Sequence, residues 1–195
     1  MLKNPQIFKN NKKYFDHRGF FQEIYLKKKF KINFLFSAIA NSKRRVIRGL
    51  HFQTKNKQTK FIYVIKGQIL DVIVNLDIKS KNFGKVKRYK MKEGDILIVP
   101  NNYAHGYECL SKNCSVLYHL DNYRNSKSEN GILFNDKELN IKWHTKRPIL
   151  SKRDRFNGLK LKNLIWVGPQ MKKYNFKIFK NKTGSLVPFS LKNNV

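Results

Sequence analysis

The sequence predicts an all-β protein, an antiparallel jelly roll with short peripheral helices. Short apolar runs recur between residues 46 and 121, and turn residues separate them. No stretch keeps the 3.6-residue period of a long amphipathic helix. The composition, 41% hydrophobic with 15 Phe and 9 Tyr, is typical of a packed β-rich core. Strands this short and this closely spaced form a sandwich or barrel, and the jelly roll is the natural closure.

The first 45 residues predict outer elements. A short strand is expected at 6–8, and a turn at 16–19 leads into a second strand. The basic run 27–31 is expected to be solvated. Residues 34–40 are apolar enough for a buried strand, and 41–45 form the next turn.

Most of the barrel is expected after this turn. The predicted strands are 46–53, 59–66, 68–76, 84–91, 95–99, 104–110 and 114–121. A loop is expected at 126–131. The length of 195 residues suits one domain with a substantial core, so we divide the chain into a domain, 1–157, and a basic C-terminal extension, 158–195. The apolar stretch 164–167 indicates that the extension packs on the domain or on a neighbouring subunit.

The chain is strongly basic, with 42 Lys and Arg against 12 Asp and Glu and a net charge of +30. Such a charge suggests nucleic acid or an anionic membrane as a partner. The cations are spread along the whole chain, however, and no nucleic-acid-binding motif accompanies them. We therefore expect no dedicated nucleic-acid partner, although a positive field would attract an anionic substrate such as a nucleotide sugar.

The sequence also predicts a cytoplasmic location. Cys109 and Cys114 are too few for a disulfide framework and are more typical of reduced thiols. The N-terminus lacks the apolar run of a signal peptide, and no run approaches the ~18 apolar residues of a spanning helix. We expect no membrane partner.

Two motifs have cupin spacing. In the first, His51 stands early in a hairpin that Gly67 closes, and in the second, Gly94 precedes Pro100 and His105. Metal-binding cupins have a second His and a Glu after the first His, and here the corresponding residues are Gln53 and Gln58. Two imidazoles without a nearby carboxylate make a poor site for zinc or iron, so we predict a cupin-like jelly roll without a metal.

Taken alone, the residues leave structural roles open for the polar side chains on these strands. His105 fits a hydrogen-bonded core histidine, and Lys60 fits a charge at a sheet edge. Tyr118 fits a half-buried strand, and Asp154 fits a surface carboxylate among cations. Arg18 and Glu23 fit a surface ion pair.

An ordered set of motifs covers roughly residues 14 to 157. It comprises Asp16-His17-Arg18-Gly19-Phe20-Phe21, Val46-Ile47-Arg48-Gly49-Leu50-His51-Phe52-Gln53, Lys60-Phe61-Ile62-Tyr63-Val64-Ile65-Lys66-Gly67, Asp71-Val72-Ile73-Val74-Asn75-Leu76, Phe83-Gly84-Lys85, Val99-Pro100 with Ala104-His105-Gly106, Leu117-Tyr118 and Leu150-Ser151-Lys152-Arg153-Asp154. Together these motifs resemble the dTDP-4-dehydrorhamnose 3,5-epimerase family. The resemblance implies a jelly-roll homodimer without a cofactor, which inverts C3 and C5 of a dTDP-4-keto-6-deoxyhexose.

The chemistry of such an epimerase requires few groups. A ketone acidifies the C–H bonds beside it, so catalysis needs a base, an acid on the opposite face, and a cation near the enolate oxygen. By resemblance, His51 is the base, Asp154 its carboxylate partner, Tyr118 the acid and Lys60 the cation. The substrate-binding residues implied by the family are Arg18, Glu23, Arg48, His105, Tyr123 and Glu129.

The chain departs from the family at three positions. Phe36 and Ala38 occupy positions that usually carry Gln and Asn, and Arg124 follows Tyr123 where a second aromatic residue is common. These changes leave open which sugar is used and whether one or both carbons are inverted. The alternatives are a 3-epimerase, a ketoisomerase on a related nucleotide sugar, and a non-catalytic sugar-binding cupin. The ketoisomerase motif has His-Ala-His, which the single His51 does not match.

Overall fold

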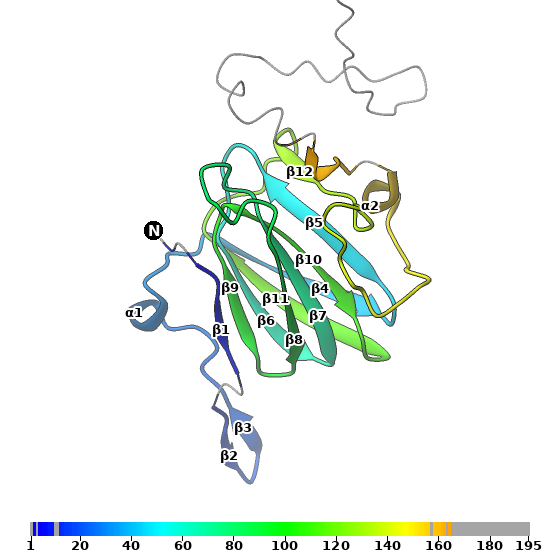
Figure 1. Ribbon diagram of the computed structural model, residues 1–195. Coiled ribbons are helices and arrows are strands. Elements are labelled where there is room, and N and C mark those ends of the chain that lie inside the picture. Colours follow the sequence, from blue (N-terminus) through cyan, green and yellow to red (C-terminus); the bar gives the residue numbers. More distant parts are fainter. Residues whose placement is uncertain (1, 3, 10–11, 157, 163, 165–195) are drawn as a thin grey trace, which may run out of the picture.

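A computed structural model of the protein describes residues 2, 4–9, 12–156, 158–162 and 164. Two five-stranded antiparallel sheets pack face to face as a jelly roll, which confirms the predicted fold class (Figure 1). The first sheet contains, in spatial order, β1 (Gln6–Phe8), β9 (Ile96–Val99), β6 (Lys60–Lys66), β11 (Asn113–Leu120) and β4 (Phe36–Lys43). The second contains β12 (Glu129–Gly131), β5 (Ile47–Gln53), β10 (Tyr103–Cys109), β7 (Gln68–Asn75) and β8 (Val86–Lys92).

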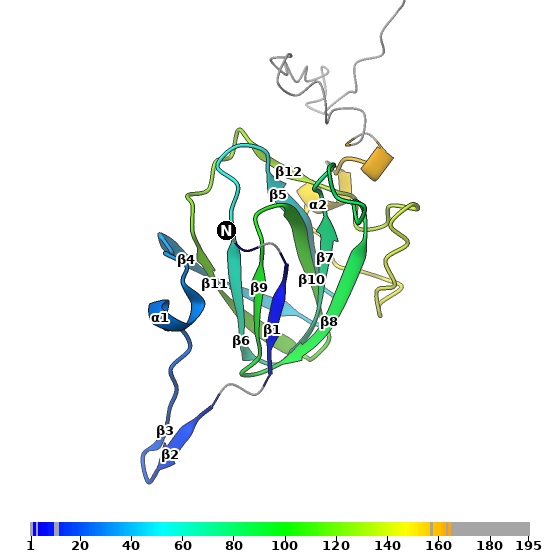
Figure 2. The ribbon, with the colours of Figure 1, turned by 60° about the vertical axis from the view of Figure 1, so that its left-hand side comes forward.

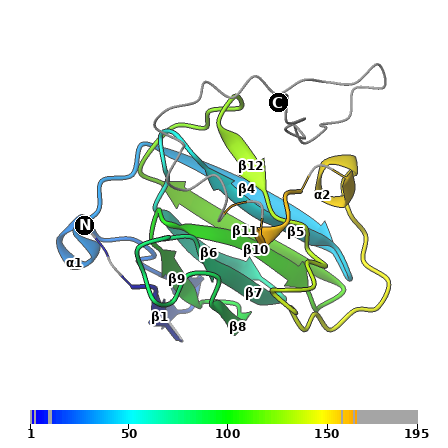
Figure 3. The same cartoon turned by 45° about the horizontal axis from the view of Figure 1, so that its top comes forward.

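Three smaller elements lie outside the sheets. The hairpin of β2 (Tyr14–Asp16) and β3 (Gly19–Phe21) projects from one end of the barrel, as Figures 1 and 2 both show. The helix α1 (Lys27–Phe30) follows it, and α2 (Lys152–Phe156) packs beside β5 (Figure 3). No helix among the described residues is long and apolar enough to cross a membrane.

The predicted strands agree with the observed ones to within about two residues, but three local predictions were wrong. Residues 129–131 form β12 instead of a loop, because they pair with the free edge of β5. The turn expected at 41–45 shortens to its last two residues, since β4 continues to Lys43 as the partner of β11. The buried strand expected at 34–40 is β4 at Phe36–Lys43, which is mostly exposed because it is the last strand of its sheet. The lysines of the basic run 27–31 are exposed as expected, and the run contains the single helical turn α1.

The space between the sheets is filled by apolar side chains from both. They include Ile62, Leu97 and Val116 from the first sheet and Ile73 and Tyr107 from the second. The free thiols of Cys109 and Cys114 are buried in the same cluster. This packing fixes which face of each strand points inward, and therefore which polar side chains enter the interior.

Each sheet also has a covered outer face. Residues from the N-terminal segment, among them Tyr25 and Phe30, pack on the outer side of the first sheet. Residues that follow β12, among them Leu139 and Leu161, pack on the outer side of the second. Leu159 and Leu161 belong to the predicted C-terminal extension, of which residues 165–195 lie outside the described part.

A bulge in β5 controls the direction of the side chains that matter most. On β10, His105 pairs with His51 and Tyr107 pairs with Arg48, so Gly49 and Leu50 together oppose the single residue Gly106. In a regular strand, residues three apart point to opposite faces. The extra residue brings Arg48 and His51 to the same, interior face.

Glycine is required on both strands at this bulge. Gly49 has φ +113°, and a Cβ there would lie 2.6 Å from the Cα of Gly106. A Cβ on Gly106 would lie 2.6 Å from the carbonyl oxygen of Arg48. The two strands therefore approach more closely than any larger residue allows.

We predict that Gly106→Ala lowers the free energy of unfolding by about 1–3 kcal/mol, because the added methyl meets main-chain atoms that cannot move independently. Gly131→Ala is the matched control, since its Cβ would be 3.1 Å from its nearest neighbour, the carbonyl oxygen of Leu50. Gly131→Ala should lower the free energy of unfolding clearly less than Gly106→Ala. Urea denaturation of both variants provides the measurement, and equal losses would contradict the steric account.

Candidate active site

The four candidate catalytic side chains come from both sheets and α2. Tyr118 on β11 pairs with Ile62 on β6, and Lys60 pairs with Leu120, which places both on the interior face of the first sheet. His51 and His105 are cross-strand partners on the second sheet. The ring centroids of His105 and Tyr118 are 5.9 Å apart, so the two sheets meet at these residues.

His51 is bound to the predicted carboxylate. Its Nε2 lies 2.6 Å from Oδ1 of Asp154, although 103 residues separate the two in the sequence. The Asp154 side chain is buried, whereas that of His51 is 32% exposed. With Nε2 facing Asp154, Nδ1 of His51 is the ring nitrogen that can reach a substrate.

The surroundings of Asp154 favour its ionised form. Burial alone would raise the pKa of this carboxyl group, but the hydrogen bond and charge of His51 outweigh it. The N–H of Gly49 and the side chain of Ser151 add to the effect, and the pKa falls below its ordinary value. Asp154 can therefore stabilise a positive charge on His51.

A second histidine–carboxylate pair lies beside the first. His105 Nε2 is 2.7 Å from Oδ2 of Asp71, and both side chains are almost completely buried. Oδ1 of Asp71 is buried with no hydrogen-bond partner. Asp71 is not among the site residues expected from the sequence, although it is the one charged residue inside the apolar run 69–74, which is a usable signal. His105 is thus a hydrogen-bonded histidine of the interior that also contacts Tyr118.

Tyr118 is held in its protonated form. Burial is the largest cause, and it raises the pKa of the hydroxyl well above its ordinary value. The nearby Tyr107 and Asp71 raise this pKa further, while the cation of Arg48 opposes them. At neutral pH the side chain is therefore a proton donor.

Lys60 is a buried cation with a perturbed pKa. Its side chain is at the end of β6, and the residue is only 8% exposed. Burial lowers the pKa of Lys60 to about 8, and the charges of Asp121 and Glu129 limit the decrease. The ammonium is mostly charged at pH 7 but loses its proton in mild alkali.

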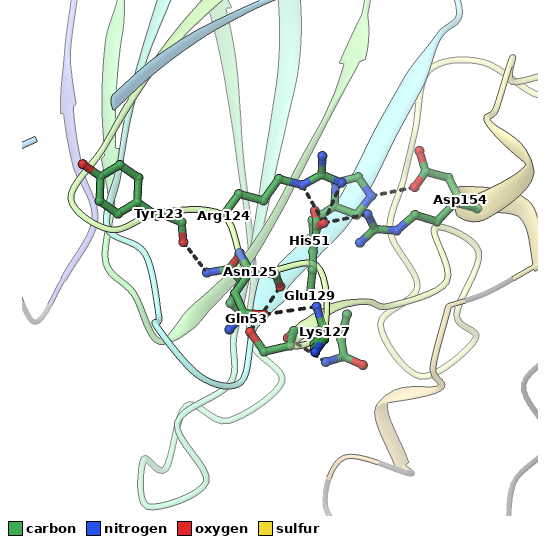
Figure 4. A network of polar contacts seen from close by, with 11 residues as sticks. His51, Gln53, Tyr123, Arg124, Asn125, Lys127, Glu129 and Asp154 are labelled. Atoms are coloured by element: carbon green, nitrogen blue, oxygen red, sulfur yellow. Dashed lines mark hydrogen bonds and ion pairs between the residues drawn. The ribbon is translucent and has the colours of Figure 1, made fainter. Parts of the chain in front are cut away.

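The rim of the site is a polar network that Figure 4 shows from close by. Glu129 accepts hydrogen bonds from Arg124 at 2.8 Å and pairs with Arg153 at 3.0 Å. Burial acts to raise the pKa of Glu129, but the two arginines outweigh it and lower the value. Because Arg153 precedes Asp154 on α2, this network joins the rim loop to the element that carries the carboxylate.

The two glutamines at the metal-ligand positions bind main-chain groups. Gln53 donates to the carbonyl of Asn56 at 2.7 Å and accepts from the N–H of Asn125 at 2.7 Å. Gln58 donates to the carbonyl of Asn122 at 2.9 Å. The described residues contain no group of three His, Cys, Asp or Glu side chains that could hold a metal ion. That the protein is free of metal stays a prediction.

Two of the expected substrate-binding residues do not reach this site within the chain. Arg18 is at the tip of the β2–β3 hairpin, where it pairs with Asp16 at 2.6 Å and not with Glu23. Glu23 lines a separate cavity of about 130 Å³ with Lys12, Tyr14 and Lys29, among others.

Arg48 and Tyr123 do border the site. Arg48 donates to Oγ of Ser42 and to the carbonyl of Asn41, both at 2.9 Å, and so links β5 to β4. Tyr123 is 62% exposed, and its ring is stacked on Phe36 at a centroid distance of 6.2 Å. The charge of Arg48 acts on Tyr118 and that of Glu129 acts on Lys60, while the carbonyl of Tyr123 accepts a hydrogen bond from Gln53 at 3.3 Å.

Comparison with known proteins identifies the family. The family model for dTDP-4-dehydrorhamnose 3,5-epimerase matches residues 3–162. The chain belongs to this family. The dTDP-4-dehydrorhamnose 3,5-epimerase of Salmonella typhimurium is 35% identical over 164 residues, covering 79% of this chain and 86% of the relative. The Shigella flexneri enzyme of the same name is 34% identical, covering 74% and 84% respectively.

A solved structure of the family supports the assignment. The crystal structure of the Bacillus anthracis dTDP-4-dehydrorhamnose 3,5-epimerase, with TDP and PPi bound, is 37% identical. It superimposes with a TM-score of 0.76, covering 80% of this chain and 94% of that one. The resemblance inferred from the motifs is thereby confirmed.

Proposed function

We propose that the protein inverts C3 and C5 of dTDP-4-dehydro-6-deoxyglucose and so forms dTDP-4-dehydrorhamnose. The observation that carries this proposal is the placement of His51, bound to Asp154, on one sheet and of Tyr118 on the other. A sugar ring between the sheets has a base on one face and an acid on the other. Membership in the epimerase family supports the same reaction.

The proposed reaction consists of proton transfers. His51 removes the proton beside the ketone, and the electron pair of the C–H bond moves to the carbonyl oxygen as an enolate. Asp154 stabilises the resulting imidazolium, and the ammonium of Lys60 stabilises the enolate oxygen. The enolate then takes a proton at carbon from Tyr118 on the opposite face, which re-forms the ketone and inverts the carbon. Before the second carbon reacts, solvent takes the proton from His51 and returns one to Tyr118. The ketone itself acidifies the C–H bond, so the scheme requires no cofactor.

We also propose that the enzyme works as a homodimer. The β2–β3 hairpin projects from the barrel, and its side chains Phe15, Phe20 and Phe21 are 75%, 53% and 67% exposed. Exposed apolar side chains of this size are typical of an interaction surface. Docking of the hairpin on a second copy would bring Arg18 towards the partner's site, which explains how a residue remote from His51 can bind substrate.

We propose the cytoplasm as the location of the protein. Its free cysteines, Cys109 and Cys114, suit that reducing compartment.

Incubation of the substrate in D₂O, followed by NMR, tests the reaction. Deuterium should enter at both C3 and C5, whereas a 3-epimerase would exchange C3 alone and a binding protein neither carbon.

His51→Ala should reduce exchange at both positions by ~10²–10⁴-fold, because the base is lost. Asp154→Asn should slow the exchange at both carbons by a smaller factor, since this substitution removes only the partner of the base. Wild-type exchange rates in His51→Ala would contradict the assignment.

Tyr118→Phe should separate exchange from inversion. The base still removes the proton in this variant, so solvent deuterium can return from the same face. Inversion fails because the acid on the other face is missing. Comparison of deuterium incorporation with the yield of the inverted sugar provides the measurement. If both fell equally, Tyr118 would not be a dedicated acid.

The pH profile tests Lys60. The side chain is cationic below its pKa of about 8, so kcat/KM should fall as the pH rises through that value. Glu129→Gln should move the fall to lower pH, because the charge of Glu129 raises this pKa. Lys60→Met serves as the control, because methionine has no charge to lose. Its activity should be low, and its kcat/KM should not fall as the pH passes the pKa of Lys60. An unchanged profile in Glu129→Gln would contradict the assignment.

A further inference from the structure

The guanidinium of Arg48 is fixed by two hydrogen bonds to β4. Its Nε donates to Oγ of Ser42 and its Nη2 donates to the carbonyl of Asn41, both at 2.9 Å. Oγ of Ser42 also lies 2.8 Å from the hydroxyl of Tyr107, the residue that pairs with Arg48 across the strands. Arg48 is exposed, whereas Ser42 and Tyr107 are 6% and 0% exposed, so two buried hydroxyls anchor an open side chain.

The anchored cation has no anionic partner in the described part of the chain. A free arginine side chain samples many rotamers, but two acceptors can hold its planar fork in one orientation. Here both acceptors, a hydroxyl and a main-chain carbonyl, are neutral. Among the residues that the structure describes, Arg48 forms no ion pair. Its charge is therefore oriented but uncompensated there.

Two buried acidic groups beside Arg48 stay neutral. Burial is the largest cause for both, and it raises the pKa of Tyr107 to about 12 and also raises the pKa of the Cys114 thiol. The charge of Arg48 acts to lower both pKa values, but neither group is ionised at neutral pH. Neither Tyr107 nor Cys114 therefore supplies the anion that this cation lacks.

The proposed reaction creates an anion at Tyr118, which packs against the interior cluster that contains Tyr107. Burial is the largest cause of the raised pKa of Tyr118, and Tyr107 and Asp71 add to it. The charge of Arg48 acts in the opposite direction. When Tyr118 gives its proton to the enolate carbon, a buried phenolate forms, which is costly unless a cation compensates it. Arg48 is such a cation, and it is already oriented before the reaction.

We propose that Arg48 stabilises the phenolate of Tyr118 while the enolate is protonated, and that the buried hydroxyls behind Arg48 hold it in place. Ser42 and Tyr107 are then positioning residues, which act through the guanidinium. The proposal rests on the proposed epimerase function and gives Arg48 a task besides the expected contact with the substrate. Arg48 affects the return of a proton and not its removal by His51. It neither gains nor loses a proton, so the balance of the reaction is unchanged.

The test compares inversion with deuterium exchange, at saturating dTDP-4-keto-6-deoxyglucose in D₂O. The measured quantity is the ratio of inverted product to deuterium in the recovered starting sugar. Arg48→Gln should lower this ratio by roughly tenfold, since a neighbouring charge changes the ionisation of a group by about that factor or more. Arg48→Lys keeps the charge but not the planar fork, so its ratio should lie between those of the wild type and Arg48→Gln. Ser42→Ala keeps Arg48 but removes its anchor, and it should lower the ratio by a smaller factor than Arg48→Gln.

Two further variants serve as controls. Ser37→Ala is matched to Ser42→Ala, because Ser37 lies on the same strand, faces the other side of the sheet and loses a hydrogen bond of 2.7 Å to His119. Ser37→Ala should leave the ratio unchanged. The double variant Tyr118→Phe with Arg48→Gln should exchange deuterium no more slowly than Tyr118→Phe alone, since Arg48 acts only through Tyr118.

The possible outcomes separate the two proposals. If Arg48 only binds the diphosphate of the substrate, Arg48→Gln will raise KM and leave the ratio unchanged, which would overturn the role proposed for Arg48. Equal ratios in Arg48→Lys and Arg48→Gln would overturn it as well, because the charge would then not matter. Exchange retained in a variant shows that its fold and base are intact, and if Arg48→Gln does not fold, an unchanged ratio in Ser42→Ala decides against the proposal. Absence of exchange in the wild type would overturn the epimerase function itself.

Discussion

The close approach of Gly49 and Gly106 is the constraint on which the site depends. Two residues of β5 oppose one residue of β10 there, so the strand turns Arg48 and His51 to the same face. The same displacement directs the N–H of Gly49 to the carboxylate of Asp154, outside the sheet. One local irregularity thus turns the imidazole of His51 inward, provides a hydrogen bond for Asp154, and leaves Arg48 free to join β5 to β4.

The interior combines two sheets with separate tasks. The second sheet contributes both histidines, and each is held by a carboxylate from another element, Asp154 from α2 and Asp71 from β7. The first sheet contributes Tyr118 and Lys60, and its strand β4 adds the buried hydroxyl of Ser42, which is hydrogen-bonded to Tyr107. Burial shifts the pKa values of Tyr118 and Lys60 in opposite directions, because it disfavours the charged form of each group. It raises the pKa of Tyr118, which stays protonated, and lowers the pKa of Lys60, which loses its proton more easily. Neither sheet alone contains all of the candidate catalytic side chains.

The strands and most of the interior residues could be predicted from the sequence, because alternation of apolar side chains is a local signal and the motifs kept their order. The segment Glu129–Gly131 has no such signal, and it becomes a strand only because the edge of β5 is available. Asp71 was missed because its role depends on His105, 34 residues away. The remote position of Arg18 could not be predicted, since no local sequence signal sets the direction in which a hairpin projects from the barrel.

The pairing of His51 with Asp154 also orders events during synthesis of the protein. The strands of both sheets up to β11 end at Leu120, so the barrel core can form before the ribosome adds α2. A nascent chain at that stage already contains the imidazole, but its carboxylate, 103 residues later in the sequence, is still missing. The pair of His51 and Asp154 is therefore completed only when α2 docks on β5, and a chain that ended before α2 would leave the imidazole without its carboxylate.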